Sequence, residues 1–221
     1  MFRKGTFVLA ALALMVVAPL AHARDCSLAI GGGAAIPTGD FSKKFDFTSS
    51  TSTGLDASVG YVITPEFTYM VNDKLGLGVD ATYSSNNIKK EDRDAIRTGT
   101  PPDPTFDLKY TQFGGGAHAK LMMPMQNGPF SPYLVVGAGV SNFKAKVESS
   151  DPAVAGDKSK SGFAGRVGIG AGYKAGQQMS IGVEGDYNFM SLKKEDFNGV
   201  SSAPSIGVKA VVSFLFKGTP K

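Results

Sequence analysis

The stretch Met179-Ser-Ile-Gly-Val-Glu-Gly-Asp-Tyr-Asn-Phe189 alternates apolar side chains with polar or small ones along its length. Successive side chains of a β-strand point to opposite faces of the sheet, so this spacing predicts a strand with one apolar and one polar face. An amphipathic helix would instead repeat its apolar residues every three or four positions. The stretch therefore predicts β-structure, and the same spacing recurs along the chain.

Eight strands are predicted in this way. Pro65 lies inside one of them and predicts a bulge or a local break, because proline cannot donate a hydrogen bond to the ladder. The alternation changes phase near Thr111, and residues 133–143 leave both facings open because either face suits an apolar environment. The predicted strands span residues 27–37, 54–71, 75–86, 106–123, 132–143, 162–174, 179–190 and 204–216.

The predicted connections alternate between long and short. The long ones are residues 38–53, 87–105, 144–161 and 191–203, and the short ones are residues 72–74, 124–131 and 175–178. Bacterial outer-membrane barrels have an even number of strands, short periplasmic turns and longer outer loops. The sequence therefore predicts an all-β, eight-stranded antiparallel up-and-down transmembrane β-barrel, with no helix after the N-terminal segment.

A soluble barrel or sandwich with its apolar face inward would show the same alternation. A water-facing exterior is rich in Lys and Glu, whereas the polar face here is mostly Gly, Ser and Thr. The apolar face also carries aromatic residues near the strand ends, as the interface girdles of membrane barrels require. Both features favour the membrane. The predicted interface aromatics are Tyr61, Tyr69, Tyr83, Tyr133, Tyr173, Tyr187, Phe189, Phe214 and Phe216.

The N-terminus has the pattern of a secretory signal peptide. Arg3 and Lys4 precede an apolar run over residues 7–20, and Ala21-His22-Ala23 is a small-x-small cleavage site. The run is shorter than the about 20 residues of a spanning helix; an uncleaved helical anchor is the alternative. We expect residues 1–23 to be removed, leaving residues 24–221 as a single, nearly neutral barrel domain.

Composition excludes several other function classes. Charged residues make up only 19% of the chain, too few for a disordered or nucleic-acid-coating protein. Cys26 is the only cysteine, which excludes an internal disulfide framework and a multi-cysteine zinc site. The glycine clusters lack the GxGxxG spacing of a nucleotide site. We therefore expect no cofactor, no metal and no nucleic-acid partner.

Charged side chains on the polar face form the main candidate site. An eight-stranded barrel has an interior just wide enough to be filled by side chains, and an unpaired buried charge costs several kcal/mol. We therefore expect these charges to pair and to close the lumen, with Arg166 bridging carboxylates on the adjacent strand; Asp56 and Lys174 are expected at the rims, in water. The predicted lumen charge network is Glu66, Asp80, Lys120, Arg166, Glu184, Asp186 and Lys209.

Catalysis has little support in the sequence. His118 is the only histidine after the signal peptide, so any Ser-His-acid arrangement must use it. We expect it to be a hydrogen-bonded histidine of the lumen or rim, and we predict no catalytic residues.

Three segments resemble a known family: residues 28–41, Pro132-Tyr-Leu-Val-Val-Gly-Ala-Gly139 and the closing Phe214-Leu-Phe216. They are similar to the small eight-stranded outer-membrane barrels of Gram-negative bacteria, the OmpA-like transmembrane domain and the outer membrane protein β-barrel domain. The chain departs from the pattern in residues 217–221, because such barrels usually end on an aromatic residue.

That resemblance implies an integral outer-membrane protein that is non-enzymatic and has an envelope structural or surface-interaction role through its outer loops. A lipid-modifying enzyme or a narrow small-solute pore on the same barrel is the alternative. The implied partners are outer-membrane lipid and lipopolysaccharide, the barrel assembly machinery, and a surface ligand at the loops.

Overall fold

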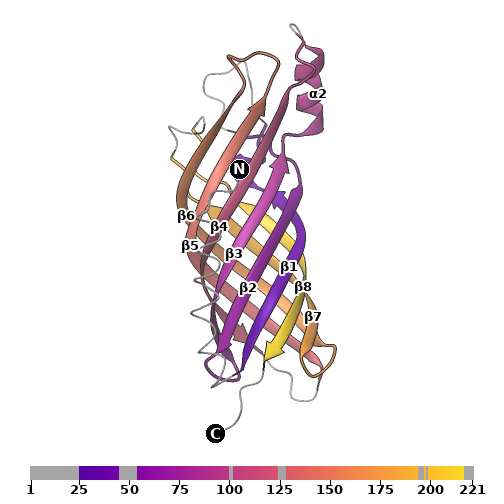
Figure 1. The fold of residues 1–221 in the computed structure, drawn as a ribbon, viewed down its shortest axis with the longest axis vertical. Coiled ribbons are helices and arrows are strands. Elements are labelled where there is room, and N and C mark those ends of the chain that lie inside the picture. Colours follow the sequence, from indigo (N-terminus) through magenta and orange to yellow (C-terminus); the bar gives the residue numbers. More distant parts are fainter. Residues whose placement is uncertain are drawn as a thin grey trace.

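The computed structural model of the protein describes residues 25–44, 54–99, 102–123, 128–193, 197 and 199–216. Eight strands close into one antiparallel barrel, in which each strand pairs with its sequence neighbours and β1 pairs with β8 (Figure 1). The predicted fold is confirmed. The strands are β1 (Cys26–Pro37), β2 (Gly60–Met70), β3 (Leu75–Asn87), β4 (Asp107–Met122), β5 (Phe130–Glu148), β6 (Gly156–Lys174), β7 (Met179–Met190) and β8 (Ser205–Phe216).

The two ends of the barrel differ. At one end, which we call the turn end, β1 begins, β8 ends, and short connections join β2 to β3 and β6 to β7. At the other, the loop end, β4, β5 and β6 extend beyond the remaining strands (Figure 1). The N-terminal segment 1–23, residues 124–127 of a predicted turn, and the tail after Phe216 lie outside the described residues.

The predicted loop 144–161 is wrong over most of its length. Lys144 pairs with Ser159 and Lys146 with Asp157, so β5 and β6 continue as a hairpin. The outward face of this hairpin is charged rather than apolar, so the segment lacks the contrast between faces that marks a membrane strand.

One helix also corrects the sequence prediction. Helix α2 (Lys90–Thr98) occupies the middle of the predicted loop 87–105. Its charges follow the helix dipole, with Glu91 and Asp92 in the first turn and Arg97 in the last. It has no buried residue, so the apolar periodicity that reveals a helix in a sequence is missing. None of the described helices is long and apolar enough to cross a membrane.

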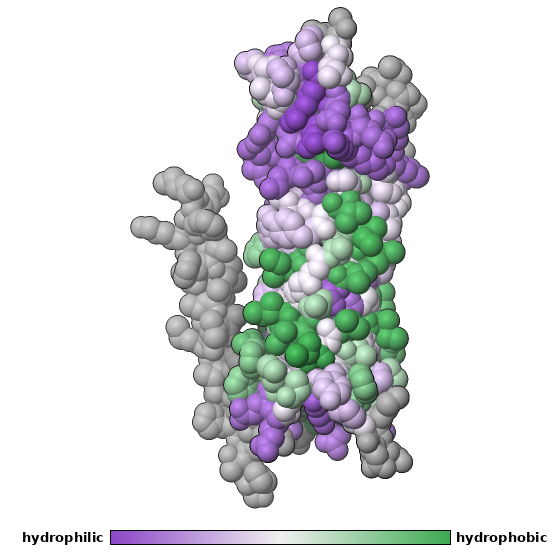
Figure 2. Space-filling model, turned by 90° about the vertical axis from the view of Figure 1, so that its right-hand side faces the viewer, coloured by the Kyte–Doolittle hydropathy of each residue, from purple (hydrophilic) through white to green (hydrophobic). Residues whose placement is uncertain are grey.

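An apolar belt crosses the face of the barrel drawn in Figure 2 between two polar ends, and exposed apolar side chains on all eight strands continue it around the barrel. Outward side chains in it are unusually exposed: Val140 is 68% exposed, Val183 64% and Ile169 60%. Monomeric soluble proteins rarely expose contiguous apolar surface of this kind. Eight of the nine predicted interface aromatics lie on the outward faces of their strands, and the exception is Tyr133.

Above the belt, the interior of the barrel changes character. At the loop end the inward side chains form an apolar cluster, which we call the cap core, around the stacked rings of Tyr110 and Phe143, whose centroids are 5.8 Å apart. The cap core consists of Phe41, Leu55, Ala57, Tyr110, Phe143, Met190, Leu192, Phe197, Val200 and Ala203.

The cap core explains the apparent phase change near Thr111. Pairing between β4 and β5 keeps one register from Asp107 opposite Glu148 to Met122 opposite Tyr133, so no side chain changes face. The surroundings change instead, because the interior turns apolar and the exterior turns polar beyond the belt. The same register settles the facing of residues 133–143, whose odd-numbered side chains point inward.

Pro65 causes no bulge. Its pairing with Ile30 of β1 continues the register on both sides, and the β2–β3 register is the same before and after it. Pairing with β3 lapses only between the Ile63–Tyr83 and Glu66–Asp80 pairs, as expected for a residue without an N–H group.

Candidate functional site

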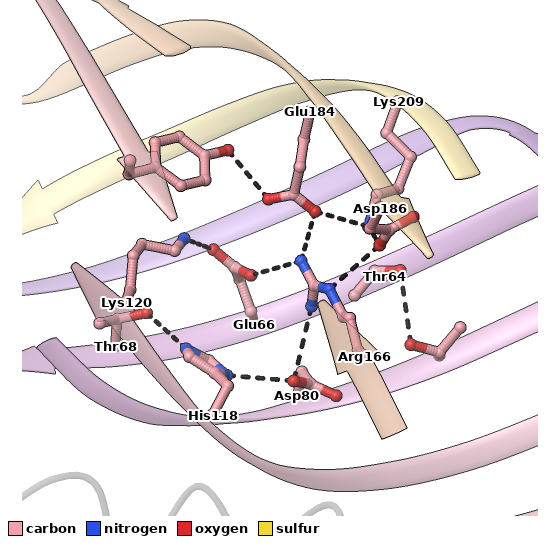
Figure 3. Close-up of polar contacts among 12 residues, drawn as sticks. Thr64, Glu66, Thr68, Asp80, His118, Lys120, Arg166, Glu184, Asp186 and Lys209 are labelled. Carbon is pink, nitrogen blue, oxygen red and sulfur yellow. Dashed lines mark hydrogen bonds and ion pairs between the residues drawn. The ribbon is translucent and has the colours of Figure 1, made fainter. Parts of the chain in front are cut away.

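The seven charged residues predicted for the lumen all lie on inward strand faces, in one layer of the barrel (Figure 3). They come from β2, β3, β4, β6, β7 and β8, so the closed topology is what brings them together. Every one of them takes part in at least one ion pair.

Arg166 stands at the centre of this layer. Its guanidinium forms an ion pair with Glu184, and its Nε lies 3.0 Å from Asp186 Oδ2. Nη1 is 3.5 Å from Asp80 Oδ2, and Nη2 is 3.6 Å from Glu66 Oε2. A planar guanidinium with several donors suits this arrangement better than a lysine ammonium.

Two lysines complete the pairing. Lys209 Nζ lies 2.7 Å from Glu184 Oε1 and 2.6 Å from Asp186 Oδ2, so it braces the same two carboxylates that Arg166 contacts. Lys120 forms an ion pair with Glu66 and lies over the ring of Tyr133, 4.7 Å from its centroid. Each buried carboxylate therefore faces at least one cation, which offsets the cost of removing it from water.

The position of Tyr133 corrects the sequence prediction. We expected it among the outward interface aromatics, but it is only 6% exposed and its hydroxyl donates a 2.9 Å hydrogen bond to Glu184 Oε2. The neighbours of Tyr133 in sequence are too apolar on both faces to show which one is inward. The constant register through β4 and β5 decides the facing, and that register is visible only in the structure.

Glycines make room for these side chains. A Cβ at Gly170 would lie 2.3 Å from Tyr133 Cζ, and one at Gly207 would lie 2.1 Å from Asp186 Oδ1. Both glycines are on inward faces. The glycine-rich pattern of the polar face thus serves packing around large polar side chains.

His118 lies beside the network and uses both ring nitrogens. Nε2 is 3.0 Å from Thr68 Oγ1, and Nδ1 is 3.1 Å from Asp80 Oδ2. The sequence predicts a hydrogen-bonded histidine of the lumen or rim, but no pattern in it indicates Thr68 as the partner. The Thr-His-Asp order is that of a catalytic triad, yet Thr68 is only 1% exposed.

The charged layer divides the interior. On its turn-end side is a vestibule of about 350 Å³, bordered by Thr68, Lys120 and Tyr133. On its loop-end side is a cavity of only about 50 Å³, bordered by Arg166 and Asp80. The cap core then fills the barrel above that cavity. Side chains thus obstruct the lumen at two levels.

The two charges expected at the rims have different environments. Lys174 is exposed at the turn end, where it borders the vestibule. Asp56 is only 1% exposed, so the expectation that it lies in water is wrong. It adopts a left-handed backbone conformation with φ of 50°, and its Oδ1 lies 2.9 Å from Lys89 Nζ. The segment before β2 folds inward and carries this side chain with it.

A pH dependence follows from Asp56. Burial, reinforced by Asp92, raises the pKa of Asp56 from 3.8 to about 6. A raised carboxyl pKa means that the fold favours the protonated form, so this contribution to stability is full below the unfolded pKa and falls as pH rises towards 6. The same contact lowers the pKa of Asp92, so Asp92 titrates below this window.

We therefore expect hydrogen-exchange protection of α2 to decrease between pH 4 and pH 6.5, after correction for intrinsic exchange rates. Asp56→Asn mimics the protonated carboxyl and should flatten this profile. Parallel profiles in the wild type and the variant would contradict the assignment.

Comparisons with known proteins agree with the fold. A family profile described as outer membrane protein beta-barrel domain matches residues 7–214. Neisserial surface protein A matches with 18% identity and a TM-score of 0.55, over 86% of this chain and 96% of that one. The attachment invasion locus protein Ail of Yersinia pestis, solved with the heparin analogue sucrose octasulfate, matches with 14% identity and a TM-score of 0.51, over 88% of this chain and 99% of that one.

No curated protein matches the sequence. At these identities the two solved structures establish the fold alone, whereas the family match spans most of the chain. The charged lumen, the apolar belt and this match agree, and the chain belongs to the outer membrane protein beta-barrel domain family.

Proposed function

We propose that the protein is a non-enzymatic outer-membrane barrel that presents its loop end at the cell surface as a folded interaction platform. Residues 1–23 act as its cleaved signal peptide, and the belt contacts membrane lipid and lipopolysaccharide. On this view the barrel assembly machinery inserts the barrel, and the short turns face the periplasm.

The folded loop end is the main support for this proposal. Strands β4, β5 and β6 run past the belt, α2 lies beside them, and the cap core joins residues from several loop-end segments. A pore would need an open lumen, whereas the interior here holds a charged layer and an apolar core. What the molecule offers to its surroundings is therefore a structured surface above the membrane.

The test shortens the hairpin without disturbing the barrel. Val147 and Gly156 are already paired, so residues 148–155 can be replaced by Asn-Gly, a preferred two-residue turn. Cells with the shortened hairpin should adhere less than wild-type cells to a panel of immobilised matrix glycoproteins, sulfated polysaccharide and bacterial cells. Lys74→Ala at the turn end is the matched control and should leave adhesion unchanged.

Both variants are compared at equal surface level, with heat-modifiable gel migration reporting a folded barrel. Equal adhesion of shortened-hairpin, control and barrel-free cells across the panel would overturn the proposal.

A lipid-modifying enzyme is the second candidate, because Thr68, His118 and Asp80 stand in triad order and Thr68 borders the turn-end vestibule. Its test is the lipid A mass spectrum of cells producing His118→Ala. A modification that appears with the wild type and disappears with the variant would support the enzyme. Identical spectra from wild-type, variant and barrel-free cells would exclude lipid A as its substrate.

A further inference from the structure

A pocket at the loop end lies on top of the cap core. Its volume is about 440 Å³. This value falls in the range of about 300–1,000 Å³ that is typical of small-molecule sites. The walls come from β4, β5, β6 and the segments that flank β2 and β8, so the extended strands build it. Its lining is mainly apolar and includes Leu55, Phe106, Leu108, Tyr110, Val147 and Phe197.

The floor of this pocket is closed. Leu55, Tyr110 and Phe197 belong to the cap core, and the Tyr110 hydroxyl donates a hydrogen bond to the Leu55 carbonyl. An apolar molecule that enters from the loop end therefore stops at the cap core and does not reach the charged layer below. The pocket has the form of a binding site rather than the mouth of a channel.

One cation stands in the pocket wall. Lys158 lies on the inward face of β6, with Nζ 5.7 Å from the centroid of the Phe197 ring. The neighbouring Asp157 also borders the pocket, but its carboxylate forms an ion pair with Lys144 on the outward side of the hairpin. Within the part of the chain that the structure describes, no carboxylate lies within ion-pair distance of Lys158.

The combination selects a particular ligand chemistry. Water gains few hydrogen bonds from walls of this composition, so an apolar group that displaces it is favoured. An anion at the mouth would meet the ammonium of Lys158 at the edge of a low-dielectric surface, where a charge-assisted hydrogen bond is stronger than in open water. The site therefore matches a molecule with an apolar tail and a single negative head.

We propose that this pocket binds a free medium-chain fatty acid, with its tail between Leu108, Val147 and Phe197 and its carboxylate at Lys158. The site is separate from the lumen network and goes beyond the platform role proposed above. It gives the loop end a small-molecule ligand of its own.

The test titrates sodium decanoate, below its micellar concentration, into the barrel in lipid nanodiscs and measures binding by calorimetry. Uptake by empty nanodiscs is subtracted. We expect saturable binding with one site per barrel. Decyltrimethylammonium has a tail of similar length with the opposite charge and should bind at least tenfold more weakly.

Substitutions of pocket residues test where the ligand binds. Val147→Trp fills the pocket from β5, and Val154→Trp narrows it at the hairpin tip, so each should weaken decanoate binding at least tenfold. Lys158→Ala should weaken decanoate about tenfold and leave decyltrimethylammonium unchanged. Lys146→Ala is the matched control, because Lys146 lies on the outward face of the same hairpin and pairs with Glu148.

Heat-modifiable migration confirms that each variant is folded. Uptake that never saturates above the empty-nanodisc background overturns the proposal. So does full decanoate affinity in both tryptophan variants, because the ligand would then sit elsewhere. Equal binding of the two amphiphiles, together with an unchanged Lys158→Ala, overturns the role of the carboxylate.

Discussion

Arg166→Ala is expected to destabilise the barrel by about 3–5 kcal/mol, the cost of removing one partner from a buried ion pair. Arg166 is 7% exposed and faces four carboxylates, and without it Lys120 and Lys209 are the lysines that still pair with them among the described residues. Glu184 and Asp186 keep Lys209, whereas Asp80 loses its only arginine or lysine partner within the described residues. The measurement is the free energy of unfolding in urea, with the barrel in lipid vesicles.

Two further variants test whether the charge and the buried position of Arg166 account for this loss. Arg166→Lys keeps a cation but loses the fork, and we expect a loss between those of the wild type and Arg166→Ala. Lys174→Ala removes a cation at the exposed turn-end rim and should change stability by less than about 0.5 kcal/mol, as surface substitutions do. If Arg166→Ala and Lys174→Ala cost the same, the charged layer contributes nothing particular to stability.

The second large effect concerns the belt. Val136 is 58% exposed on the outward face of β5, and Val136→Arg should destabilise the barrel by about 2–4 kcal/mol if that face meets hydrocarbon at the bilayer midplane. The physical reason is the desolvation of a guanidinium among lipid tails. On a surface in contact with water, the same substitution would be nearly neutral.

The control for Val136→Arg lies closer to the loop end, on the adjacent strand β6. Ser159 faces outward on the part of β6 that extends past the belt, opposite Lys144. Ser159→Arg should therefore change the free energy of unfolding by less than about 0.5 kcal/mol. A difference between the two arginine variants, measured in one vesicle preparation, shows that the edge of the membrane lies between the two positions. Similar values for both would contradict a belt that faces lipid.

Most of the barrel could be predicted from the sequence, because apolar and polar residues alternate along a membrane strand and so show which side chains share a face. Glu184 and Asp186 alternate with Val183 and Tyr187, and once the apolar face is assigned to lipid this alternation places them inside before any contact is known. The sequence also indicates that Arg166 lies on the strand adjacent to theirs and can bridge them, since one strand follows the other across a short turn. Its contacts with Glu66 and Asp80 depend on barrel closure, which no local pattern contains.

The cap core cannot be recognised in the sequence, for a different reason. Above the belt, water surrounds the outside and apolar side chains fill the inside, so an inward Tyr110 looks like an outward membrane residue in the alternation. Tyr133 was misplaced because apolar residues occupy both faces around it. Helix α2 was missed because it buries nothing. In all three cases, the sequence pattern depends on an environment that must be known beforehand.

The hairpin of β5 and β6 has a practical consequence for engineering. Its ladder keeps one register from Phe130 opposite Tyr173 to Val147 opposite Gly156, without an inserted residue. Removing two residues from each strand would therefore lower the tip by one repeat of the pleat and keep every remaining side chain on its original side. Removing one from each would turn the distal segment inside out. The height of the tip above the bilayer is thus adjustable, but only in even steps.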